Sequence, residues 1–74
     1  MSDNVKNMEE LAKLVRETRK AQGLTQDDLA GLSGTGTRFV SDLEKGKETA
    51  QIGKVLLILG ALGLGLYTLS KWKK

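Results

Sequence analysis

The first third of the chain has the apolar spacing of one amphipathic helix. Its apolar face is formed by Leu11, Leu14 and Val15. Asn7 lies three residues before Glu10, as in a capping box, and Gly23 is the residue type that commonly ends a helix. We therefore expect a helix from residue 8 to about 22, after a mobile polar tail at residues 1–7. The charged residues expected on its solvated faces are Glu10, Lys13, Arg16, Glu17, Arg19 and Lys20.

A shorter second helix is predicted over residues 26–32. Thr25 and Asp28 form another capping signature, so the helix begins with acidic residues, which the helix dipole favours. The residues that we expect to face inward are Leu29, Ala30 and Leu32. Gly34 can adopt the left-handed conformation that ends a helix, which predicts a tight turn at this point.

A third helix is predicted over about residues 37–45, ending at Gly46. Its apolar residues are Phe39, Val40 and Leu43. One face of this helix can therefore pack on the core, while its polar face is free to contact a ligand. A capped helix, a glycine turn and a second amphipathic helix together have the form of a helix-turn-helix motif.

A fourth helix is expected after Thr49, which can cap it. Its predicted inward stripe consists of Ile52, Val55, Leu56, Leu59 and Leu62, and its predicted outer face carries Leu57, Ile58 and Ala61. The glycines expected to break this helix are Gly60, Gly63 and Gly65. Residues 64–72 then alternate as a β-strand does.

A single strand needs a partner, and no other segment of the chain alternates convincingly. The simplest hypothesis is that a second copy supplies the same strand, which would make the protein a homodimer. The residues expected at this interface are Leu57, Ile58, Ala61, Leu64, Leu66, Tyr67, Thr68 and Leu69.

Length and composition favour one small, dimeric domain. A chain of 74 residues buries too little surface for two cores, and without Cys or His it has neither disulfides nor a His- or Cys-based metal site to stabilise it. A partner subunit remains as the stabilising device. The absence of cysteine and of a signal peptide is compatible with the reducing cytoplasm. We expect an all-α domain of four to five helices at residues 8–62, and a dimerisation strand with a basic tail at residues 63–74.

Charge is distributed unevenly along the chain. The net charge is +3, and residues 35–74 carry seven basic and three acidic groups, against five and six in residues 1–34. The excess of basic residues begins where the third helix begins. This distribution is suited to a second half of the chain that faces the phosphates of a nucleic acid. A solvated surface can show the same imbalance by chance.

Two other classes of protein fit the sequence less well. Residues 55–70 are uncharged and precede a basic, aromatic flank, as in a membrane anchor, but sixteen residues with three glycines are shorter than the ~20 that a spanning helix needs. An enzyme is disfavoured because no His or Cys is present, and the carboxylates lie in helix caps and on charged helix faces. No catalytic, cofactor or metal site is predicted.

The helix-turn-helix segment resembles the Xre family of repressors, which includes the lambdoid phage repressors and Cro. The resemblance covers roughly residues 8–62. Within that family, the chain resembles HipB-type antitoxins in two segments. These are residues 34–44 and the short strand that follows a helix at residues 62–69. The resemblance implies a lambda-repressor-like fold, a homodimer that binds an inverted-repeat DNA operator and represses its own operon, and a HipA-type kinase toxin as a partner.

The resemblance also assigns DNA-binding positions. They are Gln26, Gly36, Thr37, Arg38, Ser41, Asp42, Lys45 and Lys47. Gln26 stands at the phosphate-binding position at the start of the second helix. Arg38 can pair with the O6 and N7 atoms of guanine, whereas Asp42 either accepts from cytosine or holds Arg38 by an ion pair. The family often has Ser or Thr as the cap of the third helix, where this chain has Gly36, so Thr35 is an alternative cap.

The predicted function is therefore that of a sequence-specific transcriptional repressor and antitoxin. The alternatives are a protein-binding helix-turn-helix module for which DNA is incidental and, as a weaker hypothesis, a membrane-anchored helix-turn-helix protein.

Overall fold

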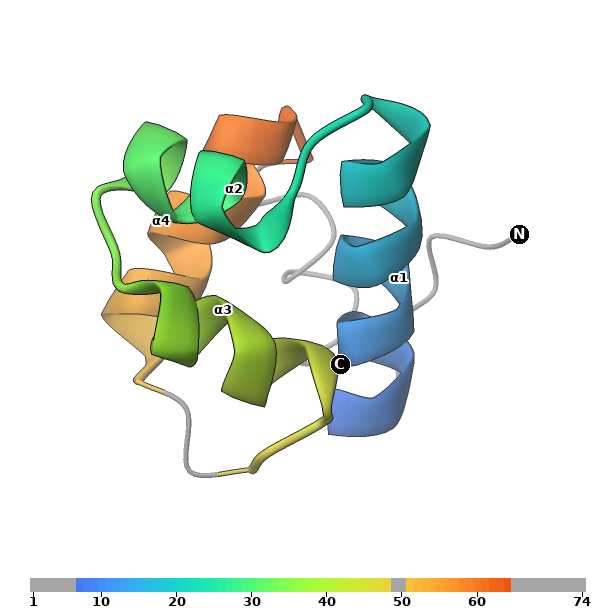
Figure 1. The fold of residues 1–74 in the computed structure, drawn as a ribbon. Coiled ribbons are helices and arrows are strands. Elements are labelled where there is room, and N and C mark those ends of the chain that lie inside the picture. The colour runs from blue at the N-terminus through green and yellow to red at the C-terminus, as the bar shows by residue number, and fades with distance from the viewer. Residues whose placement is uncertain (1–6, 49–50, 65–74) are drawn as a thin grey trace.

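The computed structural model describes residues 7–48 and 51–64, which form four α-helices. In chain order these helices are α1 (Met8–Ala21), α2 (Gln26–Ser33), α3 (Thr37–Glu44) and α4 (Ile52–Leu62). α1 runs along one side of the molecule, and α2 contacts both α3 and α4 (Figure 1). The all-α prediction is confirmed for the described residues. Residues 1–6 of the expected N-terminal tail lie outside these ranges, as do Thr49 and most of the expected strand, including Leu66, Tyr67, Thr68 and Leu69.

Side chains cap the first two helices as their sequences predict. The Oδ1 atom of Asn7 accepts a hydrogen bond from the N–H of Glu10 at 2.9 Å. At the start of α2, Thr25 Oγ1 accepts from the N–H of Asp28, and Asp28 Oδ2 accepts from the N–H of Thr25. Each cap satisfies backbone donors that have no partner within the helix, so both helix starts are fixed locally.

The two ends of the α2–α3 turn are set by glycines. Gly34 has φ 74°, in the left-handed region, and ends α2. Gly36 is the N-cap residue of α3 and offers no side chain to cap it. Thr35, the alternative cap, instead has its hydroxyl 2.9 Å from that of Ser33. The turn is therefore short, and α3 follows α2 after only three residues.

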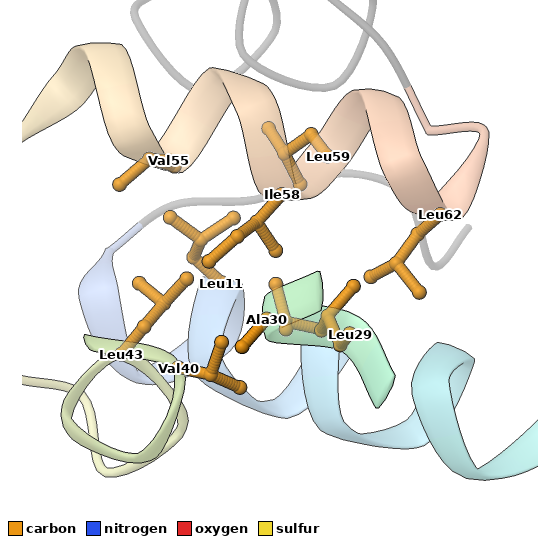
Figure 2. Packing of buried hydrophobic residues seen from close by; sticks show 10 residues of the cluster. Leu11, Leu29, Ala30, Val40, Leu43, Val55, Ile58, Leu59 and Leu62 are labelled. Atoms are coloured by element: carbon orange, nitrogen blue, oxygen red, sulfur yellow. The ribbon is translucent and has the colours of Figure 1, made fainter. Parts of the chain in front are cut away.

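All four helices contribute to one hydrophobic core. Figure 2 shows side chains of α4 pointing toward side chains from α1, α2 and α3. The buried cluster is Leu11, Val15, Leu29, Ala30, Val40, Leu43, Val55, Ile58, Leu59 and Leu62. Burial of a large apolar side chain contributes about 1.5–3 kcal/mol, so this cluster is the main source of the fold's stability.

The buried face of α4 differs from the predicted one. Ile58, expected on the outer face, is fully buried, whereas Ile52, expected inside, is 54% exposed. The buried stripe is Val55, Ile58, Leu59 and Leu62. Most positions of α4 are apolar, so the helical period alone does not decide which face packs. Leu57 is exposed and Ala61 half-buried, so both retain surface on the outer side.

Three further predictions, about an inward position and about the two ends of α4, are corrected. Leu32 is 65% exposed, because α2 buries Leu29, Ala30 and Ser33 instead. Gly60 does not break α4, which continues to Leu62 and ends at Gly63 with φ 81°. The N–H of Leu64 then donates to the carbonyl of Leu59 at 2.8 Å, and Leu64 packs on the core. Gln51, not Thr49, is the N-cap residue of α4.

None of the helices in the described ranges has the length and apolar character needed to cross a bilayer.

Candidate nucleic-acid interface

The polar face of α3 is directed away from the core. The buried residues of α3 are Val40, Leu43 and Glu44, and Phe39 is half-buried. The residues predicted to bind DNA lie on its other sides: Gly36, Thr37 and Arg38 are exposed, and Ser41 and Asp42 are half-buried. Lys45 and Lys47, which follow α3 directly, are exposed as well. We call Thr37, Arg38, Ser41 and Asp42 the polar face of α3.

A buried ion pair fixes the end of α3 against α1. Arg19 Nε lies 2.6 Å from Glu44 Oε2, and Arg19 Nη2 lies 3.0 Å from Glu44 Oε1. The guanidinium also donates to the carbonyl of Leu24 at 2.7 Å, and Arg16 donates to the carbonyl of Glu44. Two parallel bonds between guanidinium and carboxylate give a fixed geometry, so α3 cannot rotate without breaking them.

The charges of this pair shift both pKa values. The hydrogen bond to Glu44 raises the pKa of Arg19 further above its ordinary value, although burial opposes this. For Glu44, burial alone would raise the pKa. Hydrogen bonds from Arg19 and Gln26, with the charges of Arg19 and Arg16, outweigh burial and hold that pKa below its ordinary value. Glu44 is therefore ionised at neutral pH.

Gln26 belongs to the same network. Its side-chain amide donates to Glu44 Oε1 at 3.1 Å, so the first residue of α2 is tied to the last residue of α3. Gln26 remains half-buried and its backbone N–H lies in the first turn of α2. The amino end of a helix favours anions, although Asp27 and Asp28 in the same turn add negative charge.

The other end of α3 is tied to α2 by Thr37. Its hydroxyl donates a hydrogen bond to Asp27 Oδ1 at 2.6 Å. Thr37 therefore uses its hydrogen within the protein, and its oxygen can only accept from a ligand. This limits the predicted base contact of Thr37 to donors such as amino groups of bases.

Asp42 is paired, but not with Arg38. The nearest cation is Lys47, whose Nζ lies 3.5 Å from Asp42 Oδ2, so the i to i+4 ion pair offered by the sequence is not present. The side chain of Arg38 makes no hydrogen bond or ion pair within residues 7–48 and 51–64. Its guanidinium is therefore available to a ligand.

The comparisons with known proteins agree with this geometry. A family model described as helix-turn-helix matches residues 15–69, most of the chain. The chain belongs to the Xre/Cro-type helix-turn-helix family. A protein of Sinorhizobium fredii (strain NBRC 101917 / NGR234), named uncharacterized HTH-type transcriptional regulator y4mF, is 52% identical over 66 residues, which cover 89% of this chain and 87% of the relative. No solved structure matches the chain.

In this helix-turn-helix protein, sequence reasoning missed the charged contacts between helices. Arg19 was expected on a solvated face, but it is only 8% exposed, and Glu44 was given no role. Arg19 lies four residues after Val15 and eight after Leu11, so its spacing already places it on the buried stripe of α1. Lys54, close to Phe39 of α3, was also passed over.

Proposed function

We propose that this chain is a sequence-specific DNA-binding transcriptional repressor that binds an inverted-repeat operator as a homodimer. The observation that carries this proposal is the polar face of α3, where Arg38 is exposed and unpaired among the described residues while both ends of α3 are fixed by hydrogen bonds. Membership of the helix-turn-helix family and a relative named as a transcriptional regulator support it. Such a protein acts where the DNA is, in the cytoplasm.

In this proposal α3 lies in the major groove and the surrounding residues bind the backbone. Arg38 pairs with guanine, Ser41 and Thr37 contact neighbouring bases, and Gln26 binds phosphate next to the start of α2. Gly36 allows the backbone to approach the DNA closely. Lys45 and Lys47 bind phosphate after α3, and Asp42 orients Lys47 and accepts from cytosine.

Dimerisation determines the form of the operator. Two α3 helices related by a two-fold axis enter successive major grooves, so the half-sites should be about 34 Å apart, which is one turn of DNA. The proposed dimer interface uses the strand that follows Leu64 together with the outer side of α4, where Leu57 is exposed.

The finer part of the proposal is that the chain is a HipB-like antitoxin that neutralises a HipA-type kinase. It rests on the likeness of residues 34–44 and 62–69 to that subgroup. The test is co-purification of the full chain with a HipA-type kinase, followed by a phosphorylation assay. A kinase that stays fully active in the presence of excess chain would refute the antitoxin role and leave the repressor role standing.

Two substitutions test the DNA-binding proposal directly. Arg38→Ala should cost about 1–3 kcal/mol per half-site and relax the preference at one base position, because base-edge contacts carry sequence information that phosphate contacts do not. Lys45→Ala should weaken binding to all duplexes alike. Binding is measured on operator and random duplexes at one salt concentration. Equal losses on both duplexes for both variants would overturn the assigned roles. A folded chain that enriches no sequence would favour a protein-binding module.

A further inference from the structure

The polar face of α3 has a neighbouring helix on each side. On one side lies α2, with the Thr37–Asp27 hydrogen bond and the Gln26–Glu44 contact. On the other side lies the first turn of α4, where Lys54 Nζ stands 5.6 Å from the centroid of the Phe39 ring. Phe39 directly follows Arg38 and precedes Asp42 by three residues, so it borders the polar face on the side of α4.

Lys54 is a cation without an anionic partner in the described part of the chain. The two ion pairs there are Arg19 with Glu44 and Lys47 with Asp42. Lys54 is exposed, and its ammonium is held by the ring of a side chain that packs against the core. A cation–π contact of this kind leaves the outer side of the ammonium free for a second, stronger anionic partner.

We propose that Lys54 binds a DNA phosphate on the side of α3 opposite to Gln26. This inference rests on the proposed function, because it requires α3 to lie in the major groove. That groove is about 12 Å wide and a helix is about 10–12 Å in diameter, so a phosphate backbone borders the helix on both sides. Gln26 faces one backbone strand and Lys54 the other, and together they set the depth and tilt of α3.

Phe39 is the positioning residue of this contact. Its ring keeps the flexible Lys54 side chain beside α3, so less rotamer freedom is lost when phosphate is bound. Phe39 itself is half-buried and touches no base in this arrangement. Exchange of the ring for an aliphatic side chain of similar burial should therefore weaken DNA binding only through Lys54.

The experiment compares Lys54→Ala with Lys20→Ala, a matched control in the exposed last turn of α1. Affinity for operator and random duplexes is measured over a range of salt concentrations. We expect Lys54→Ala to lower the affinity for both duplexes by the same factor. It should also reduce the slope of log affinity against log salt by about one per bound protomer. Lys20→Ala should leave both quantities unchanged, and Lys54→Arg should retain binding.

A double-mutant cycle tests the part played by Phe39. Phe39→Leu alone should weaken binding, but it should have no further effect in a chain that already carries Lys54→Ala, provided that thermal melting shows each variant folded. Additive losses would overturn the positioning role. If the unaltered chain binds DNA and Lys54→Ala behaves as Lys20→Ala does, the Lys54 proposal alone is wrong. If the unaltered chain binds no duplex, the proposed function itself fails.

Discussion

The carboxylate of Glu44 joins three helices through hydrogen bonds. Arg19 of α1 binds both of its oxygens, Gln26 of α2 binds one of them, and Glu44 itself ends α3. No buried polar side-chain atom of the described residues lacks a hydrogen-bond partner. Because buried charges are tolerated only when they are paired, the network fixes the orientation of α3 relative to its neighbours.

Removal of one charge from this network should be strongly destabilising. Glu44→Gln leaves the guanidinium of Arg19 buried without its counter-charge, and we expect a loss of about 3 kcal/mol in the free energy of unfolding, measured by urea denaturation. As a control, Arg19→Met combined with Glu44→Leu removes both charges and should recover most of that loss. A double variant less stable than Glu44→Gln would contradict this account.

The same residue predicts how stability depends on pH. The pKa of Glu44 is lower in the folded chain than its ordinary value of 4.5, so its contribution is complete above about that pH and is lost as the pH falls through the folded-state pKa. Asp28, whose pKa is lowered by its hydrogen bonds with Thr25, acts in the same direction. Thermal melting between pH 6 and about 2 should show a falling midpoint. The Arg19→Met, Glu44→Leu variant should show a smaller fall, and an equal fall would exclude Glu44 as a cause.

At the scale of residues, sequence reasoning predicted local contacts and missed distant ones. The caps at Asn7 and Thr25 are confirmed because each depends on neighbours within three residues. The Arg19 to Glu44 contact joins residues 25 positions apart and cannot be seen from either segment alone. The DNA contacts of Arg38 and its neighbours stay predictions, since they depend on a ligand.

At the scale of elements, each described helix ends beside a glycine with positive φ, at Gly23, Gly34, Gly46 and Gly63. These residues allow the chain to turn within a few residues, which brings short helices together around a small core. The sequence predicted the first three of these ends correctly. For α4 it named Gly63, where the helix ends, but also Gly60, which lies inside the helix. It also placed Ile58 on the wrong face, because most positions of α4 are apolar.

Two glycines of the α2 region should respond oppositely to alanine. Gly31 lies inside α2 with no atom near an added Cβ, so Gly31→Ala should stabilise the fold by about 0.5–1 kcal/mol. Gly34 also has free space, but its φ of 74° disfavours a side chain, and Gly34→Ala should destabilise by about 1–2 kcal/mol. Urea midpoints of the two variants provide the measurement. A stabilising Gly34→Ala would show that the turn is not set by backbone conformation.

At the scale of the whole molecule, the proposed dimer would add stability to a small core. A single domain of this length has a thin margin of stability, and a second subunit can supply further burial. Within residues 7–48 and 51–64, Leu64 packs against the core that the four helices form.

Truncation should separate folding from dimerisation. A chain that ends at Leu64 keeps the buried cluster and the Leu64 to Leu59 hydrogen bond, but it lacks the proposed interface strand. We expect a folded monomer that binds a single half-site weakly, because the second α3 is no longer held at the correct spacing. Sedimentation in the binding buffer measures the mass. A truncated chain that still sediments as a dimer would refute strand pairing as the dimer contact.

The central claim is that α3 reads DNA sequence as one half of a symmetric pair. The most direct measurement is selection of duplexes from a random library by the purified full chain, with its mass determined in the same buffer. We expect a dimer that enriches an inverted repeat whose half-sites are centred about one helical turn apart. A folded chain that enriches no sequence would contradict it.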